Sequence, residues 1–232
     1  MDNDYLEVLS FLEAYAGVHY QKPASNSDEF TILKDKAKAT LKVLHRICGA
    51  CASCMSPHLI ITNRKIWLRG DRRAVRDYFW VQLKQQEFKN RPISISIFAE
   101  SRLREEPFFY RLALEYDEKK VNNDAYRAYK RYSELVNTEH LRNANHLRFL
   151  VLQNEDNNSW DFCDDPNELQ RYISKMNNSV NIRERVQPSY YVSRKNNATN
   201  TDRTADEFDH QFHEGLCSLI PYYNHVMDCY NS

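Results

Sequence analysis

Glycine is scarce in this sequence: only four of its 232 residues are glycine. The loops that cradle nucleotide phosphates need glycine, because only glycine lets the backbone approach a phosphate closely. The sequence contains neither the Walker A pattern nor the dinucleotide-binding pattern GxGxxG. The usual signatures of ATP-, GTP- and dinucleotide-binding proteins are therefore absent.

Long apolar runs are missing as well. No stretch approaches the roughly 20 apolar residues needed to cross a bilayer. The acidic segment MDNDYLEVLSFLEAY also lacks the basic start of a secretion signal. We therefore expect a cytoplasmic protein without membrane contact, whose six cysteines stay reduced.

Neither sign of charge is in excess, because 32 basic residues balance 32 acidic ones. A neutral chain is not expected to bind polyanions strongly and without sequence preference. A local basic face stays open as an alternative, since affinity depends on which side chains meet phosphates. The fifteen tyrosines suit either stacking on bases or filling a core.

The periodicity of apolar residues predicts an α+β fold with a mixed, mostly antiparallel sheet, packed helices and an N-terminal helical extension. We divide the chain into the extension, residues 1–70, and an α+β domain, residues 71–232. Helices are expected at 4–16, 29–48, 124–136, 165–176 and from 204, and strands at 92–98, 108–116, 146–153, 158–162 and 189–195. The segments LIIT and KIWL, on either side of Asn63, predict a short hairpin.

Helix ends are also readable. Asp165 followed by Pro166 is a strong helix start, and Thr204 with Glu207 forms a capping box. We expect the second helix to end near Gly49, and Pro221 to break or kink the last helix.

Cys48, Cys51 and Cys54 form a C-x2-C-x2-C pattern. Thiolates at this spacing can converge on one zinc ion, with His58, Cys163 or Cys217 as a fourth ligand. The alternative is a helix end that carries small, partly buried thiols, without any cofactor. The absence of a second cysteine pair favours the alternative.

Acidic residues at strand ends raise the possibility of a catalytic site. Glu100, Glu115 and Asp117 would suit a Mg²⁺-dependent nuclease, whose metal is held by carboxylates. Such a site also needs a lysine on the adjoining strand, and ISISIFAES supplies none. A solvated turn is the better interpretation.

The densest basic stretch runs from Arg64 to Arg76 and includes Arg72 and Arg73, with Trp67, Tyr78 and Trp80 interleaved. Guanidinium groups bind phosphates and aromatic rings stack on exposed bases. A solvated face with its aromatic rings in the core explains the pattern equally well.

The segments SWDF, ELQRYIS, VQPSYYVSRK and EFDHQFHEGLCSLIPYYNHVM follow one another in the last third of the chain, after YFWVQL, RPISISIF and FFYRLALEYDE. This order resembles the N-terminal DNA-binding domain of McrB-type modification-dependent restriction GTPases over about residues 76–232. The glycine-rich segment of that family is replaced here by KQQEFKNR, and the tryptophan after its proline by Ile93.

The resemblance implies a domain that flips a base out of duplex DNA into an aromatic pocket. Tyr190 or Tyr191 would stack on the base and Tyr116 would form a second wall. Phosphate contacts would come from Arg91, Arg102, Arg104 and Lys195, together with Arg72 and Arg73 of the basic stretch. We therefore expect a non-catalytic module of a restriction or phage-defence system that binds double-stranded DNA, plain or modified, beside an NTPase or nuclease partner. The alternatives are a protein-interaction or counter-defence module and the nuclease described above.

Overall fold

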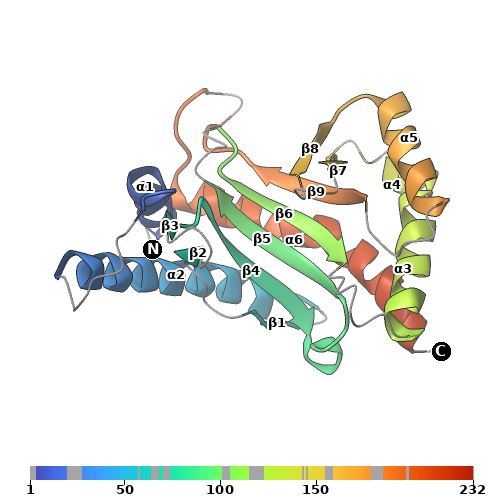
Figure 1. The fold of residues 1–232 in the computed structure, drawn as a ribbon, viewed down its shortest axis with the longest axis horizontal. Helices are drawn as coiled ribbons and strands as arrows, with labels where there is room; N and C mark the ends of the chain where they lie inside the picture. The colour runs from blue at the N-terminus through green and yellow to red at the C-terminus, as the bar shows by residue number, and fades with distance from the viewer. Residues whose placement is uncertain are drawn as a thin grey trace. The chain divides into compact units, whose positions relative to one another are not determined.

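The structure is a computed structural model that describes residues 4–19, 28–56, 58–63, 68–69, 74–100, 105–114, 123–142, 144, 146–154, 159–178, 185–196 and 199–231. The fold is α+β, as the sequence predicts. The helices are α1 (Asp4–Tyr15), α2 (Asp28–Ser53), α3 (Asn123–Val136), α4 (Glu139–Arg142), α5 (Pro166–Asn177) and α6 (Ala205–Met227), with short 3-10 helices η1 (Gln86–Phe88) and η3 (Asp228–Tyr230) (Figure 1).

The described strands form an antiparallel sheet of seven strands in the order β1-β4-β5-β6-β9-β7-β8, and a separate pair β2-β3. Their bounds are β1 (Leu59–Ile61), β2 (Leu68–Arg69), β3 (Ala74–Val75), β4 (Tyr78–Gln85), β5 (Ile93–Glu100), β6 (Phe108–Leu114), β7 (Arg148–Asn154), β8 (Ser159–Cys163) and β9 (Val186–Val192). Strands are thus present at all five expected segments, although β9 begins and ends three residues before the segment 189–195.

The described residues cluster into two compact units, and each is treated separately below. The first comprises Met1–Leu83, Ile97–Phe109 and Val192–Glu214. Its core holds an aromatic cluster in which the ring of Tyr5 stacks on Phe208 at 4.9 Å and meets Phe108 edge-on at 5.9 Å. Helices α1 and α2, blue in Figure 1, pack against each other, and Arg46 of α2 forms an ion pair of 2.7 Å with Asp4 of α1.

The second unit comprises Lys84–Ser96, Tyr110–Tyr191 and Gly215–Ser232. In it α5 packs against β7 and β8, and α3 packs against α5. Tyr132 of α3 is fully buried, and its hydroxyl lies 3.1 Å from the carbonyl of Leu112 and 2.8 Å from that of Val186. A single tyrosine thus ties α3 to β6 and β9.

Both predicted helix caps are confirmed. The Asp165 carboxylate accepts a hydrogen bond of 2.9 Å from the Asn167 amide at the start of α5. Before α6, the Thr204 hydroxyl accepts from the Glu207 amide at 3.3 Å, while the Glu207 carboxylate accepts from the Thr204 amide at 2.8 Å. These are the two reciprocal bonds of a capping box.

Two local predictions need correction. Helix α2 continues through Gly49 to Ser53, where the backbone of Gly49 stays helical and its φ is not positive. Helix α6 continues past Pro221 to Met227, so the proline does not break the helix, because it removes one backbone hydrogen bond and can leave the remaining ones in place. The hairpin expected from LIIT and KIWL stays a prediction, since residues 64–67 lie outside the described ranges.

Every helix in the described ranges is too short or too polar to span a membrane. The division at residue 70 stays a prediction.

Candidate functional site

The register of three strands determines which side chains share a face in the second unit. β7 pairs antiparallel with β9, with Arg148 opposite Ser189, and with β8 on its other edge, with Leu150 opposite Phe162. Side chains alternate along a strand. Arg148, Phe162 and Tyr191 therefore belong to one face of the sheet, and Tyr190 belongs to the other.

Tyr190 lies in the hydrophobic core, with only 7% of its surface exposed. Its ring meets that of Tyr110 edge-on at 6.4 Å. Both rings close against α6 at Gly215, where an added Cβ would lie 2.9 Å from Tyr190 and 2.8 Å from Tyr110. In this conformation the ring of Tyr190 offers no open face for a base.

Tyr191 occupies a different environment, because it is only partly buried and lies beside a cation. Its ring meets Phe162 of β8 edge-on at 4.6 Å. The guanidinium of Arg148 lies over both rings, 4.0 Å from the centre of Phe162 and 5.1 Å from that of Tyr191. We call these three residues the Arg148 cluster. Cation–π contact holds its guanidinium in a defined orientation.

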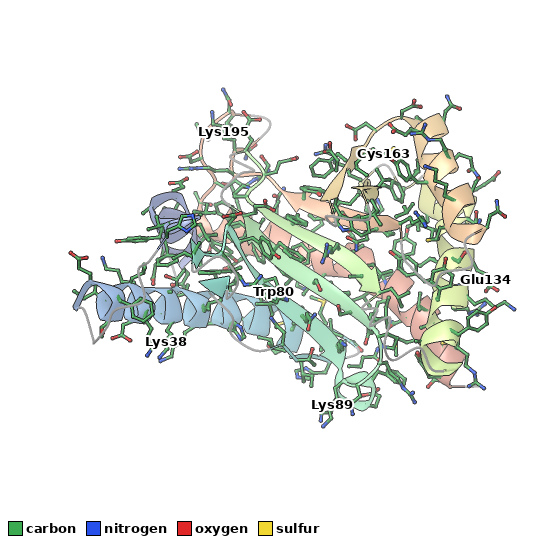
Figure 2. All side chains as sticks on the ribbon, in the orientation of Figure 1. Lys38, Trp80, Lys89, Glu134, Cys163 and Lys195 are labelled. Carbon is green, nitrogen blue, oxygen red and sulfur yellow. The ribbon has the colours of Figure 1, made fainter. Side chains whose placement is uncertain are left out.

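A hollow of about 460 Å³ begins at the same arginine. It is lined by Glu139, Ala144, Leu147, Arg148, Phe149, Cys163, Asp164, Asp165, Pro166 and Leu169. All of these residues belong to the second unit, and Figure 2 labels one of them, Cys163, at the end of β8. We call this space the Arg148 hollow. A cavity of this size is in the range used for small ligands.

The rim of the Arg148 hollow carries more negative than positive charge. Three carboxylates, Glu139, Asp164 and Asp165, face one guanidinium. Asp164 forms an ion pair of 3.6 Å with Arg148, and its side chain stays 74% exposed. Carboxylate oxygens only accept hydrogen bonds when ionised. The hollow therefore suits a ligand that presents hydrogen-bond donors or positive charge.

Cys163 adds a thiol to the wall of the hollow. Its Sγ–H donates to the Asp165 carbonyl at 3.4 Å. Burial, reinforced by the nearby Glu168 carboxylate, raises the pKa of the Cys163 thiol. A protonated thiol is a weak nucleophile, so Cys163 is better suited to lining the hollow than to covalent chemistry.

Of the other expected DNA contacts, the structure describes Arg91 and Lys195, and neither lines the Arg148 hollow. The guanidinium of Arg91 lies 4.3 Å from the ring centre of Tyr230. Lys195 is exposed on the polar loop after β9 and is labelled in Figure 2. The remaining expected contacts, Tyr116, Arg102, Arg104, Arg72 and Arg73, lie outside the described residues, as do Glu115 and Asp117 of the nuclease alternative.

Part of the basic stretch is described. The Arg76 guanidinium lies 4.9 Å from the ring centre of Trp80 and 5.9 Å from that of Tyr78. Both rings are half-buried on β4. This arrangement combines the two interpretations of the basic stretch, because both rings are half-buried and the Arg76 guanidinium lies near them on the exposed side.

The cysteine pattern lies at the end of α2. Cys48 is fully buried in the helix, Cys51 is half-buried, and Cys54 is exposed just beyond the last turn. Burial raises the pKa of Cys48 well above its ordinary value, and burial together with the nearby Asp209 carboxylate raises the pKa of Cys51 to about 11. Zinc binds thiolates, and these surroundings favour thiols. In the part of the chain that the structure describes, no group of three histidine, cysteine or acidic residues is arranged to hold a metal.

Arg148 and Phe162 were missed by the sequence reasoning. Both fell in segments expected to be strands, but the sequence does not show which strands are neighbours. A signal was available: Arg148 is the one charged residue of the strand RFLVLQN and stands at its start, before four apolar residues. A charge in such a position marks the point where the sheet meets solvent.

No family model matches this sequence, and comparisons with curated proteins and with solved structures found no match either.

Proposed function

We propose that this chain is a non-catalytic DNA-binding module that reads a base displaced from a duplex. It would act in the cytoplasm as the recognition part of a restriction or phage-defence assembly, beside an NTPase or nuclease partner. The observation that carries the proposal is the Arg148 cluster, whose arginine also lines the Arg148 hollow. The order of segments that resembles McrB-type restriction GTPases supports the same conclusion.

The energetics of base reading fit these parts. Moving a base out of the stack costs a few kcal/mol, and stacking on aromatic side chains returns about 1–3 kcal/mol per base. The Arg148 guanidinium, held over the rings of Phe162 and Tyr191, supplies the stacking surface of the hollow, while the carboxylates of the hollow can accept from an amino group of cytosine or adenine. Tyr191 contributes to stacking through Arg148 in this proposal, since Tyr190 is buried.

The test is duplex binding by fluorescence anisotropy at about 50 mM salt, where phosphate contacts are strongest. Plain, C5-methylated and hydroxymethylated duplexes are compared for the natural chain and for Arg148→Gln. We expect Arg148→Gln to weaken binding of the preferred duplex about tenfold, or about 1.4 kcal/mol, and to reduce the preference among duplexes.

Arg171→Gln is the matched control. Arg171 is also a surface arginine with a carboxylate partner, Glu168 at 3.1 Å, and an aromatic neighbour, Tyr172 at 5.5 Å, but it does not line the hollow. Failure of the natural chain to bind any duplex would remove the proposal. Equal binding by the two variants would remove the Arg148 hollow as the reading site.

The acidic rim favours one second candidate, a protein-interaction module. Three carboxylates around one guanidinium also suit a lysine or arginine side chain of a partner peptide. In that case Asp164→Asn would weaken binding of lysine-rich peptides, and no duplex would bind. Duplex binding that exceeds peptide binding at the same salt would argue against this candidate.

A further inference from the structure

A second hollow, of about 420 Å³, lies in the same unit between α3 and the turn η3. Its lining differs in kind from that of the Arg148 hollow: three cations, Arg127, Lys130 and Arg131, face two carboxylates, Glu134 and Asp228, with the thiol of Cys229 between them. Glu134, labelled in Figure 2, marks its position on α3. We call this the α3–η3 surface.

The three cations share one side of α3 because of their spacing. Residues three and four apart lie on the same face of a helix, with their Cβ atoms about 5–6 Å apart. Lys130 lies three residues after Arg127 and Arg131 lies four after it, so both flank Arg127 on that side. Three neighbouring cations suit a ligand that carries more than one negative charge.

Two of these cations are available to a ligand. Arg127 and Lys130 are exposed, and within the described ranges neither forms an ion pair. Arg131 pairs with Glu134 at 3.2 Å, but the two side chains are 41% and 48% exposed. An exposed pair of this type contributes about 1 kcal/mol or less, so a phosphate can replace the carboxylate.

A fourth cation lies at the other side of the turn. Arg91 stacks on Tyr230, and Tyr230 belongs to the same turn as Asp228 and Cys229 of the α3–η3 surface. The ring of Tyr230 also lies 6.2 Å from that of Phe88, so it is held from two sides. This stacking orients the guanidinium of Arg91 beside the turn. Arg91 is one of the residues that the sequence predicts to contact phosphate.

The α3–η3 surface connects to the Arg148 hollow through the chain. From Arg127 to Val136 the helix advances about 13 Å at 1.5 Å per residue. Shortly after it comes α4, whose Glu139 lines the Arg148 hollow.

We propose that the α3–η3 surface binds phosphate groups of the DNA backbone, with Arg127 and Lys130 as the main contacts and Arg91 and Arg131 as flanking ones. The inference rests on the proposed function and adds the surface that positions the duplex. Phosphate contacts set register and orientation without reading sequence. The α3–η3 surface therefore contributes equally to every duplex, and the Arg148 hollow contributes the preference among them.

The experiment compares Arg127→Gln/Lys130→Gln with Arg171→Gln/Lys175→Gln on α5, which removes the same charge from another exposed helical face. Binding to plain and modified duplexes is measured across a salt series. We expect the α3 variant to lose about tenfold in affinity for all duplexes alike. The negative slope of log affinity against log salt should become shallower by about two, since each lost phosphate contact removes about 0.9 from its magnitude. The α5 variant should keep the natural slope.

The outcomes separate the two proposals. If the natural chain binds and the α3 variant behaves like the α5 variant, the α3–η3 surface is not a DNA contact, while the proposed function stands. If the natural chain binds no duplex, both proposals fall. A third arm uses inorganic phosphate in a thermal-shift assay against chloride of equal ionic strength. Stabilisation by phosphate that the α3 variant loses, together with unchanged duplex binding, would assign the surface to a free phosphate ligand and overturn the DNA assignment.

Discussion

Substitution of Gly215 by alanine tests the packing that removes Tyr190 from the candidate site. An added Cβ at Gly215 would lie 2.8 and 2.9 Å from two carbons of the Tyr110 ring and 2.9 Å from a carbon of the Tyr190 ring. Carbon atoms prefer separations of about 3.5–4.0 Å. Tyr110 is fully buried and Tyr190 is 7% exposed, so neither ring can move away freely.

Two opposing effects set the size of the change. Overpacking a core costs about 1–3 kcal/mol, while replacing glycine by alanine inside a helix gains about 1 kcal/mol. Close contacts to two rings place the cost in the upper part of its range. We therefore expect Gly215→Ala to lower the free energy of unfolding by about 1–2 kcal/mol.

Gly49→Ala is the matched control, since Gly49 also lies inside a helix. Its added Cβ would meet only Ile61, at an ordinary 3.8 Å, so we expect a gain of about 0.5–1 kcal/mol. Urea unfolding followed by circular dichroism measures both variants. If Gly215→Ala stabilises the protein as much as Gly49→Ala does, the two rings do not close against α6, and Tyr190 returns as a base-stacking candidate.

Three further predictions concern other parts of the chain. Because the pKa of Cys51 is raised to about 11, its alkylation should stay slow at pH 8 and rise steeply toward pH 11, whereas the exposed Cys54 should react at pH 8. Mass spectrometry of labelled peptides measures the two alkylation rates separately. Equal rates at pH 8 would contradict the burial of Cys51. The protonated Cys51 thiol stabilises the fold fully below about pH 9, the ordinary pKa of the thiol, and this contribution should be lost as the pH rises through about 11. Asp165→Ala should cost about 1 kcal/mol by removing the cap that Asn167 uses, and an unchanged urea midpoint would show that the cap is dispensable. Tyr132→Phe should cost about 1–2 kcal/mol, because carbonyls of β6 and β9 lose their buried donor; unchanged amide hydrogen exchange in these strands would argue against it.

Local features of the fold were readable from the sequence because they depend on neighbours in the chain. The Asp165 and Thr204 caps each need only residues within one helical turn, and both formed as expected. The alternating, β-branched run ISISIF and the run FFYRLAL each predict a strand, and both strands are present, buried on both faces. The fold class follows from such elements, since strands and helices interleave along the chain.

Pairing between strands was not readable, because it depends on residues far apart in sequence. Among the described strands, β1 pairs with β4, and nothing in the segments LIIT and YFWVQL indicates this pairing. The end of α2 was predicted wrongly for a related reason. A glycine stops a helix only where the chain must turn, and tertiary packing outweighs its weak helix propensity. Gly49 lies close enough to Ile61 for contact, so α2 continues there along a packed surface.

The same distinction explains the candidate site. Arg148, Phe162 and Tyr191 come from three strands, and no spacing in the sequence indicates that the rings of Phe162 and Tyr191 lie 4.6 Å apart. Alternation along a strand assigns Tyr190 and Tyr191 to opposite faces of the sheet, but it does not tell which of the two faces is buried. That choice is made by α6, whose Gly215 admits one of the two rings into the core.

Net charge was the sequence feature most easily misread. A formal charge of zero is compatible with a unit that carries one acidic and one basic hollow, since the opposite charges cancel only in the sum. Four cations around η3 correspond to a salt slope of about −3 to −4 if each meets one phosphate. That slope is far below that of strongly basic DNA-binding proteins, so backbone contacts alone would hold DNA weakly at physiological salt. Stable binding would then require either the base in the Arg148 hollow or a partner that binds the same duplex, and this is the behaviour expected of a recognition module that acts only within an assembly.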